Sequence, residues 1–248
     1  MQKVAFISDI HSNLEAITAV MADIDALGIT RIVCLGDIIG YGPDPVETLR
    51  LCKRCEWVIV GNHELALTEG GEKFKDYAKR AIQWTVQELR GTPEGDAYLR
   101  NIRTLPLRMT EWGHLFVHGA PTDPVNRYLL PKLSDRPEIL AAEFAAFEHY
   151  CFVGHTHLPG VFEPGMPFSP AAELFMNIYV LDPKGKAIIN VGSVGQPRDR
   201  DVRACYVVFD GDSVVYRRVP YDVEKTAAKI RKIPMLDDFL ADRLLQGR

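Results

Sequence analysis

The chain has 248 residues, of which 47% are hydrophobic and 25% are charged, and its formal net charge is −4. This length suits one large α/β domain, and the weak negative charge gives no global electrostatic reason to bind nucleic acid or an anionic membrane. No stretch approaches the ~20 apolar residues of a membrane-spanning helix, and the start of the chain is typical of a buried strand, not of a signal peptide. We therefore expect a single domain over residues 1–248 and a cytoplasmic location.

Short apolar runs rich in β-branched residues recur along the chain and predict strands. In the first half they are separated by helical patterns, which is typical of a parallel or mixed sheet covered by helices. From about residue 177 only tight turns separate them, which predicts antiparallel strands. The runs are 3–8, 31–36, 56–61, 114–119, 150–154, 178–181, 187–191, 204–209 and 213–219.

Two helix starts are well marked. Ser12 and Glu15 have the spacing of a capping box, and apolar residues then recur at helical spacing as far as Gly28. Residues 44–47 read Asp-Pro-Val-Glu, which predicts a second helix with Asp44 as its N-cap. Further helices are expected over 71–90, 134–149, 222–231 and 236–245, and the long loops at 121–133 and 163–171 are candidates for a substrate rim.

The five cysteines form no even framework for disulfide bonds. Three of them stand singly in apolar runs, where a reduced thiol behaves as a small hydrophobic side chain. Cys52 and Cys55 form a C-x-x-C pair that could be a redox couple or half of a zinc site. We favour a third interpretation, two cysteines at a helix end, because there is no second pair and no aromatic redox context.

Residues that can bind metals follow five of the predicted strands. Groups at the carboxyl ends of neighbouring strands in an α/β sheet converge on one crevice. Each motif alone has an ordinary explanation, such as a turn, a cap or a solvated histidine, but five of the seven histidines fall in these positions. The residues are Asp9 and His11, Asp37, Asn62 and His63, His118, and His155 and His157.

The number and type of these donors favour two metal ions over one. Two carboxylates, one amide oxygen and four or five imidazoles are too many for one divalent ion, and a carboxylate can bridge two cations. Paired ions about 3.5–4 Å apart acidify a shared water and hold a phosphate. Mixed nitrogen and oxygen ligands without thiolate favour Mn, Fe, Zn or Co, among which the sequence does not choose.

The motifs D-x-H, GD, GNH, a histidine before glycine, and GH-x-H occur in this order over residues 3–205. This set resembles the calcineurin-like metallophosphoesterase family. The longer segments 36–45 and 192–199 are similar to its compact bacterial and archaeal branch, which is YfcE-like and diadenosine tetraphosphatase-like. The resemblance implies a four-layer α/β/β/α sandwich with two mixed sheets, and an enzyme that hydrolyses small phosphate esters, with phosphodiesters or nucleotides foremost.

The resemblance also implies a role for each residue of the set. One metal would be held by Asp9, His11, Asp37 and His157, and the second by Asp37, Asn62, His118 and His155, with Asp37 as the bridge. A hydroxide that bridges the two metals would attack phosphorus. His63 would be the catalytic histidine, which protonates the leaving oxygen or stabilises the developing charge.

Two looser segments are candidates for substrate binding. Tyr41 in "GYGPDP" could lie beside the site, or this segment could only turn the chain into the next helix. The backbone N–H groups of Gly192 and Ser193 could hold a phosphate, and Arg198 could pair with one. The alternative for 190–199 is a glycine-rich turn with surface charges. Arg127 and Tyr128 are weaker candidates of the same kind.

A second class of function stays open. The family includes a retromer subunit that serves as a scaffold with a degraded metal site, so a weakly active or non-catalytic binding protein is the alternative. Every ligand position here holds a competent residue, which argues against it. Binding of nucleic acid through a basic surface lacks support because Lys and Arg are dispersed. A homo-oligomer is compatible with the sequence, but no segment indicates an interface.

Overall fold

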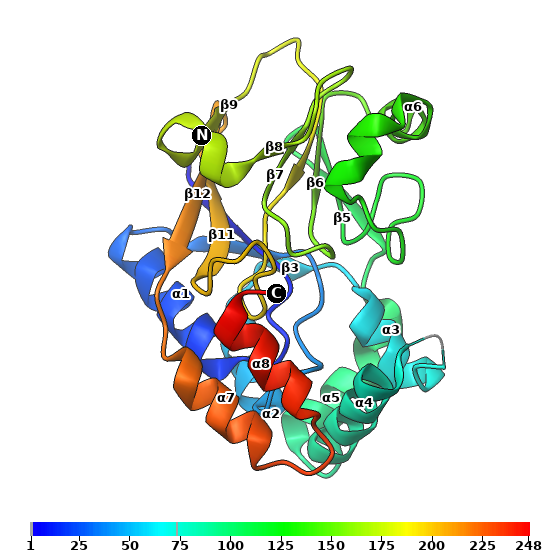
Figure 1. The fold of residues 1–248 in the computed structure, drawn as a ribbon, viewed down its shortest axis with the longest axis vertical. Helices are drawn as coiled ribbons and strands as arrows, with labels where there is room; N and C mark the ends of the chain where they lie inside the picture. The colour runs from blue at the N-terminus through cyan, green and yellow to red at the C-terminus, as the bar shows by residue number, and fades with distance from the viewer. Residues whose placement is uncertain (1, 73) are drawn as a thin grey trace.

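The computed structural model describes residues 2–72 and 74–248, which form two six-stranded mixed sheets (Figure 1). In spatial order the first sheet contains β3 (Trp57–Val58), β2 (Arg31–Cys34), β1 (Val4–Ile7), β11 (Ala204–Phe209), β12 (Ser213–Val219) and β9 (Ile178–Val180). The second contains β4 (Arg108–Glu111), β5 (His114–Val117), β6 (Tyr150–Val153), β10 (Ala187–Asn190), β7 (Gly160–Phe162) and β8 (Ser169–Pro170).

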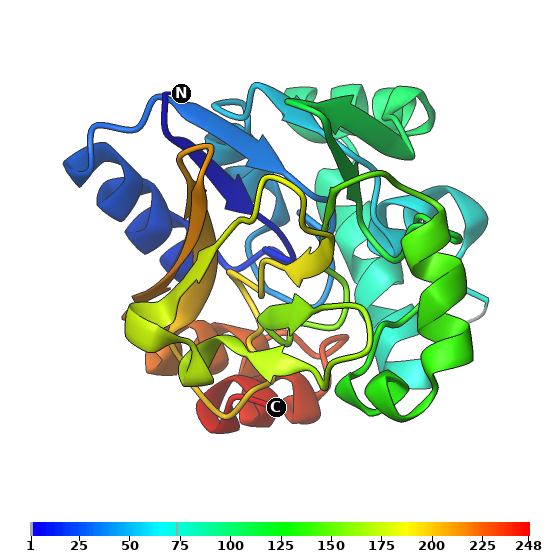
Figure 2. The ribbon, with the colours of Figure 1, turned by 90° about the horizontal axis from the view of Figure 1, so that it is seen from above.

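The helices of the described residues are α1 (Leu14–Ala26), α2 (Pro45–Cys52), α3 (Asn62–Glu69), α4 (Asp76–Leu89), α5 (Pro93–Asn101), α6 (Pro137–Ala145), α7 (Val223–Arg231) and α8 (Asp238–Gln246). α1 and α2 pack on the outer face of the first sheet and α6 on that of the second, whereas α4, α7 and α8 pack against one another. Short 3₁₀ turns occur at Ile102–Thr104, Pro131–Asp135, Ala171–Glu173 and Phe175–Asn177. Figure 2 shows α1 and α6 on opposite sides of the strands.

The core between the sheets follows from the alternation of side chains along β1. Successive side chains of a strand point to opposite faces, and Val4 and Phe6 therefore pack between the sheets while Ala5 and Ile7 pack under the helices. The ring of Phe6 lies 5.2 Å from that of Phe116 in β5, across the two sheets. The predicted four-layer α/β/β/α sandwich with two mixed sheets is confirmed.

The last two helices add a separate apolar cluster at one end of the molecule. Ile230 of α7 and Leu240 of α8 are buried together with Ala81 and Trp84 of α4 and with Tyr41. Figure 1 shows α7 and α8 side by side at the lower end of the ribbon. This packing brings the C-terminal end of the chain close to Tyr41, which the sequence made a candidate for substrate binding.

The pairing of the late strands differs from the antiparallel series that tight turns predicted. β9 pairs with β12 in the first sheet, whereas β10 lies in the second sheet, parallel to β6 and antiparallel to β7. The turn at 182–186 thus crosses between the sheets. Its short, Gly- and Pro-containing sequence does not distinguish a crossing between sheets from a hairpin within one sheet.

The helix starts also differ in detail from the sequence prediction. Asn13, not Ser12, caps α1 by accepting from the amide of Ala16. Asp44 occupies the predicted N-cap position of α2, but its carboxylate binds the ammonium of Lys229 instead of a backbone amide. Two helices, α3 and α5, were not predicted. Within the described residues no helix combines the length and the apolar character needed to cross a membrane.

Candidate active site

The eight residues of the predicted constellation lie together at one edge of the sandwich. Asp9 and His11 follow β1, Asp37 follows β2, Asn62 and His63 begin α3, His118 follows β5, and His155 and His157 follow β6. Their donor atoms form three overlapping groups within the described residues, each with all atoms within 4.8 Å of one another. The groups are Asp9, His11 and His157; His11, Asp37 and His63; and Asp37, His118 and His155.

One half of the cluster is built around Asp9. His157 Nε2 lies 3.2 Å from Asp9 Oδ1 and 3.2 Å from His11 Nε2. Asp37 Oδ2 lies 3.8 Å from His11 Nε2. Four donor atoms from three separate strands therefore surround one small volume.

The other half is built around His118. His118 Nε2 lies 3.1 Å from His155 Nδ1, 3.1 Å from Asn62 Oδ1 and 3.3 Å from Asp37 Oδ2. Asp37 Oδ2 thus faces both halves of the cluster. Its second oxygen, Oδ1, accepts a hydrogen bond of 2.9 Å from the amide of His63.

The outer nitrogens of the imidazoles fix which nitrogen faces inward. His11 Nδ1 lies 3.2 Å from the carbonyl of Ile39, and His118 Nδ1 lies 2.7 Å from that of Leu35. A ring nitrogen that donates to a carbonyl leaves the other nitrogen of a neutral imidazole with a bare lone pair. The same holds for His157 Nδ1, at 2.6 Å from the carbonyl of Gln196. The inward lone pairs of His11 and His157 then face each other, an arrangement that a cation between them stabilises.

Several of these residues adopt a backbone conformation that L-residues avoid. Among the described residues, eleven that are not glycine have positive φ, and six of these lie at the site: Asp9, His11, Asp37, Tyr41, His155 and His157. Each such conformation costs about 1–3 kcal/mol and persists only where the surroundings impose it. Such strain collects at sites whose side-chain positions matter for function.

Charges within the cluster determine its protonation. Burial raises the pKa of Asp9 and Asp37, but the neighbouring imidazoles outweigh burial and hold both pKa values below the usual range. Burial lowers the pKa of His118. The negative charge of Asp37 and its hydrogen bond with His118 outweigh burial and raise this pKa to about 9. The two carboxylates therefore attract positive charge, which divalent cations supply more strongly than a proton. The donor set and its charge fit a pair of such cations.

His63 lies beside these donors, with one ring nitrogen within 4.8 Å of donor atoms of His11 and Asp37. Its ring lies 4.3 Å from Tyr41 and 5.0 Å from Phe74, and its buried Nδ1 has no hydrogen-bond partner among the described residues. Burial lowers its pKa to about 4. Gly40, at φ 92°, lies so close to the ring that a side chain there would collide with it. A buried, neutral imidazole with one free nitrogen is thus held over the site.

Glu64 is a site residue that the sequence analysis did not identify. Its carboxylate is fully buried and accepts from the amides of Asp37 (2.7 Å), Ile38 (2.9 Å) and Gly61 (2.9 Å). It therefore fixes both the Asp37 loop and the turn before Asn62. Its place three residues after the N-cap Gly61 is half of a capping box, a signal that the "GNHE" segment does contain.

A pocket of about 680 Å³ opens over His155. The remaining lining includes Tyr41 and Arg198, two of the predicted substrate contacts, Tyr128, a weaker candidate, and Asn62, a predicted metal ligand. The sequence did not single out the other lining residues, which are Phe74, Lys75, Tyr77, Ala78, Asp123, Asn126 and Arg243. The loop at 121–133 thus forms part of the rim. The loop at 163–171 does not, because Pro164, Gly165 and Met166 line a different cavity.

Two other predicted substrate contacts do not line this pocket. The amide of Gly192 donates to Asn190 Oδ1 (2.9 Å), and Ser193 is fully buried with its hydroxyl donating to the carbonyl of Asp9 (2.8 Å). The amide of Gly192 and the hydroxyl of Ser193 therefore bind within the loop behind the predicted ligand residues. Of the weaker candidates, Tyr128 stacks on His155 at 3.7 Å, whereas Arg127 pairs with Glu143.

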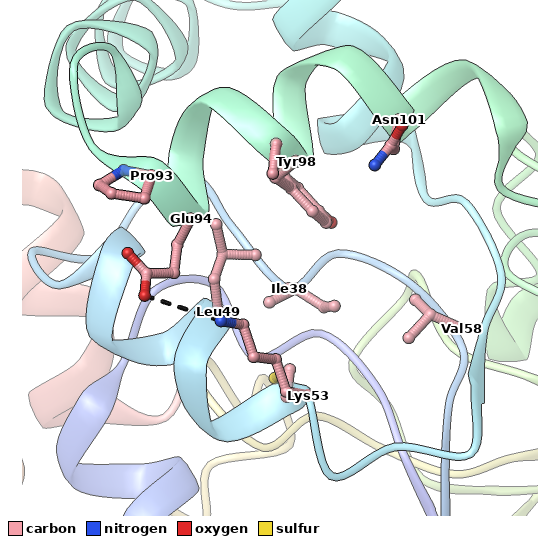
Figure 3. A pocket seen from close by; sticks show the side chains of 10 residues that line it. Ile38, Leu49, Lys53, Val58, Pro93, Glu94, Tyr98 and Asn101 are labelled. Atoms are coloured by element: carbon pink, nitrogen blue, oxygen red, sulfur yellow. Dashed lines mark ion pairs between the residues drawn. The ribbon is translucent and has the colours of Figure 1, made fainter.

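A second cavity, of about 350 Å³, lies on the other side of the Asp37 loop (Figure 3). Ile38 and Leu49 point into it, and the ion pair between Lys53 and Glu94 lies at its edge. None of the predicted metal-ligand residues lines it. Tyr98 connects the two sides, since it lines the cavity and its hydroxyl donates to Glu64 at 3.2 Å.

Cys52 also lines this second cavity, and it is a free thiol, as is Cys55. The neighbouring Cys55 and burial raise the pKa of Cys52 well above its usual value. A protonated, buried thiol is a poor nucleophile and a poor metal ligand. This environment favours the structural interpretation of the C-x-x-C pair.

Comparison with known proteins agrees with this geometry. Residues 2–213 match the calcineurin-like phosphoesterase superfamily domain. The chain is 36% identical to an uncharacterised protein, MJ0912, of Methanocaldococcus jannaschii, covering 99% of this chain and 98% of that protein. It is also 31% identical to a symmetrical bis(5'-nucleosyl)-tetraphosphatase of Neisseria gonorrhoeae, in an alignment that covers 46% of this chain and 42% of that protein.

The fold is shared with solved structures. A metallophosphoesterase from Sphaerobacter thermophilus matches with a TM-score of 0.83 and 34% identity, covering 100% of this chain and 99% of that one. A hypothetical protein, PH1004, from Pyrococcus horikoshii matches in fold with a TM-score of 0.77 at 21% identity, covering 100% and 99%. The chain belongs to the calcineurin-like phosphoesterase superfamily and is a phosphoric ester hydrolase.

Proposed function

We propose that the protein hydrolyses small phosphate esters with two divalent metal ions, and that phosphodiesters or nucleotides are its substrates. The observation that carries the proposal is the set of imidazole nitrogens and carboxylate oxygens that face one another at 3.1–3.3 Å in two adjoining groups. Residues 1–248 would act as one domain.

The distances support a specific division of the ligands. Asp9, His11, Asp37 and His157 would hold one ion, and Asp37, Asn62, His118 and His155 the other, with Asp37 between them. Mn, Fe, Zn or Co suits such nitrogen and oxygen ligands. When bound, a pair of such ions acidifies water and neutralises the oxygens of a phosphoryl group.

The surrounding residues would orient the substrate and the leaving group. His63, beside the proposed ligands, would hydrogen-bond the leaving oxygen through a ring nitrogen as negative charge develops there. Its backbone amide, bound to Asp37 Oδ1, ties its position to the carboxylate that would lie between the two ions. Burial keeps the imidazole neutral at neutral pH, so we expect it to donate a hydrogen bond and not to carry a full positive charge.

Two observations favour nucleotides among phosphate esters. The pocket beside His155 is lined by several aromatic rings and by arginine, which suit a base and a phosphate. The similarity to symmetrical bis(5'-nucleosyl)-tetraphosphatases points the same way, although it covers less than half of either chain.

A parallel rate assay on metal-stripped protein tests this function. Mn²⁺ would be added back with bis(p-nitrophenyl) phosphate or with p-nitrophenyl phosphate. Metal-dependent release from the diester is the expected result, while turnover of the monoester alone would change the assignment to a phosphatase. No turnover of either, with metal bound, would contradict the proposed catalysis and favour the metal-dependent binding role that the sequence left open.

The role of His63 has its own test. His63→Ala should retain its metals and lose about 10²–10⁴-fold in kcat, the range for loss of a positioned acid or base. His149→Ala is the matched control, because His149 is exposed and belongs to neither half of the cluster. Unchanged turnover in His63→Ala would remove His63 from the mechanism.

A further inference from the structure

Two half-buried arginines of the pocket, Arg198 and Arg243, form no ion pair with a side-chain carboxylate in the described part of the chain. Other arginines near the C-terminal half are paired: Arg217 binds Asp23 and Arg218 binds Asp199. Guanidinium groups that lack a carboxylate side chain as partner are unusual inside a concave pocket, because burial of a charge is costly unless an opposite charge compensates it.

Neutral acceptors hold Arg198 in place. Its Nη2 donates to Gln196 Oε1 at 2.7 Å, and its backbone amide donates to the carbonyl of His157 at 3.3 Å. The carbonyl of Gln196 in turn binds His157 Nδ1. Arg198 is thus anchored directly to the segment that carries a proposed metal ligand, with its positive charge uncompensated.

Arg243 reaches the same pocket from α8. Its Nε donates to the main-chain oxygen of Arg248 at 2.8 Å, and its guanidinium lies 5.3 Å from the centre of the Phe239 ring. The amide of Arg200 donates to the carbonyl of Gly247 at 2.8 Å, which joins the end of α8 to the segment that follows Arg198. Two elements that are far apart in the sequence therefore bring these two arginines to one pocket.

The two guanidinium groups oppose each other electrostatically. Burial and the charge of Arg198 lower the pKa of Arg243 to about 10, so that Arg243 stays charged at neutral pH. The one carboxylate of the pocket lining, Asp123, accepts from the amides of Val125 and Asn126 with its Oδ1. An anion between the arginines would relieve this repulsion.

Aromatic rings surround the same space. Tyr41 and Tyr77 lie with ring centres 6.5 Å apart at 30° to each other, and Tyr128 covers His155. Tyr128 is 47% exposed, so one of its faces is free. Such rings bind a planar group by stacking, and a base is the planar group that accompanies phosphates in nucleotides.

We propose that Arg198 and Arg243 form a second anion subsite, which binds a phosphate group linked to the one that is hydrolysed, while the tyrosines pack against the base. The substrate class is then nucleotides with two or more linked phosphates, as opposed to simple monophosphate esters. This inference rests on the proposed function. Arg243 lies outside residues 2–213, so the family match does not contain this part of the subsite.

Binding of two nucleotide ligands to the Mn²⁺-loaded protein tests the subsite. Isothermal titration measures the Kd of AMP, which has one phosphate, and of α,β-methylene-ADP, which has two phosphorus groups. A methylene group joins these two groups, so the link between them is not hydrolysed during the measurement. We expect the second ligand to bind about tenfold more tightly, and Arg198→Gln or Arg243→Gln to bring the ratio of the two Kd values close to one.

Arg231→Gln is the matched control, because Arg231 pairs with Asp242 between α7 and α8 and does not line the pocket. It should leave the affinity ratio unchanged, which separates loss of the subsite from loosening of α8. Thermal unfolding of each variant shows whether it folds. If Arg243→Gln does not fold, Arg198→Gln carries the test.

The outcomes separate this inference from the proposed function. Equal Kd values for the two ligands, or a ratio that survives both substitutions, would overturn the subsite. If bis(p-nitrophenyl) phosphate, which has a single phosphate, is hydrolysed while the Kd values are equal, the proposed function stands and the subsite fails. If it is not hydrolysed while the ratio depends on both arginines, the subsite stands as a binding site and the proposed catalysis fails.

Discussion

Two cavities lie on opposite sides of the segment that follows β2, and they differ in chemistry. Tyr41 lines the pocket over the histidines. Two arginines of this pocket lack a carboxylate side chain as partner, and two of its lining residues, Tyr41 and His155, have positive φ. Ile38 lines the cavity of Figure 3, whose interior is largely apolar and whose lysine is paired. The comparison teaches that uncompensated polar groups and backbone strain mark a chemical site better than an apolar lining does.

The two sides are not independent, because one buried carboxylate touches both. Glu64 binds the amides of the Asp37 loop and accepts from Tyr98, which lines the apolar cavity. Its own pKa is raised to about 7, since burial and the charge of Asp37 disfavour a second negative charge. Substitutions on each side can therefore distinguish residues that affect catalysis from residues that affect only stability.

The largest effect is expected on the histidine side. Asp37→Asn should lower kcat/KM by about 1000-fold, because a bound metal supplies several kcal/mol of transition-state stabilisation and 1.4 kcal/mol is tenfold in rate. Turnover of a diester measures the drop in kcat/KM, and mass spectrometry measures how much metal the variant retains. Asp135→Asn, in the 3₁₀ turn at Pro131–Asp135 outside the cluster, is the control. Full metal content together with full activity would contradict a bridging role for Asp37.

Glu64→Gln comes next and probes the connection between the sides. The side-chain amide nitrogen of glutamine is a donor and would replace a carboxylate oxygen that accepts hydrogen bonds from backbone N–H groups. Because two donors cannot bond to each other, the Asp37 loop should shift. We expect metal affinity or activity to fall about 10–100-fold, as for residues that orient metal ligands. Tyr98→Phe removes a single donor to Glu64 and should have a clearly smaller effect. An equal effect of the two variants would show that the hydroxyl, not the amide contacts, controls the loop.

A substitution on the apolar side should change stability and leave the chemistry intact. Leu49→Ala removes a buried side chain that lines the cavity and should lower the free energy of unfolding by about 2 kcal/mol. The kcat of the folded fraction should stay within twofold of the starting value. Denaturant unfolding and diester turnover measure the two quantities. A large drop in kcat at constant metal content would show that this cavity controls the active site.

The smallest effect concerns the attachment of the C-terminal helices. Glu15 Oε1 binds Lys229 of α7 at 2.7 Å, and Lys229 and Lys225 outweigh burial and hold the pKa of Glu15 below its usual value of 4.5. A lowered carboxylate pKa stabilises the fold above the unfolded pKa, and this stability is lost as pH falls through the folded pKa. Glu15→Gln should therefore lower the free energy of unfolding by about 1 kcal/mol at pH 7.

The pH dependence is the check on this last prediction. The difference in free energy of unfolding between the two proteins should shrink as pH falls below the usual Glu pKa of 4.5, and should vanish once Glu15 of the folded protein is protonated. Glu224→Gln is the control, since Glu224 is in the first turn of α7, the helix that carries Lys229, and has no ion pair within the described residues. A stability difference that does not shrink as pH falls would exclude the ion pair as its source.

Short-range patterns in the sequence predicted a sheet covered by helices and the cluster of polar residues, whereas the four-layer arrangement was implied by the family resemblance. Apolar runs such as 150–154 form strands, and residues that can bind metals follow these strands. Because the carboxyl ends of neighbouring strands lie at the same edge of a sheet, these residues were expected to lie together. The constellation, its order and the family could thus be identified without coordinates. The helix cap at Asn13, one residue from the prediction, shows the usual uncertainty of boundaries.

What the sequence did not predict depends on contacts between distant residues. Arg243 lies 45 positions after Arg198 and reaches the same pocket only because α8 ends against residue 200. The same is true of the crossing of β9 and β10 between sheets, which no local signal encodes. Gly192 and Ser193 have the composition of a phosphate-binding loop, but hydrogen bonds to Asn190 and Asp9 use their polar groups internally.

The left-handed backbone of the proposed ligand residues has a consequence for folding thermodynamics. Asp9, Asp37 and His157 are each held in a conformation that opposes folding, and Nε2 of His157 lies 3.2 Å from Oδ1 of Asp9. A cation that binds only the native state adds RT ln(1 + [L]/Kd) to the free energy of unfolding, about 2.7 kcal/mol at 100 times Kd. The melting temperature of this protein should then follow the free metal concentration, so that a chelator weakens the fold as well as the chemistry.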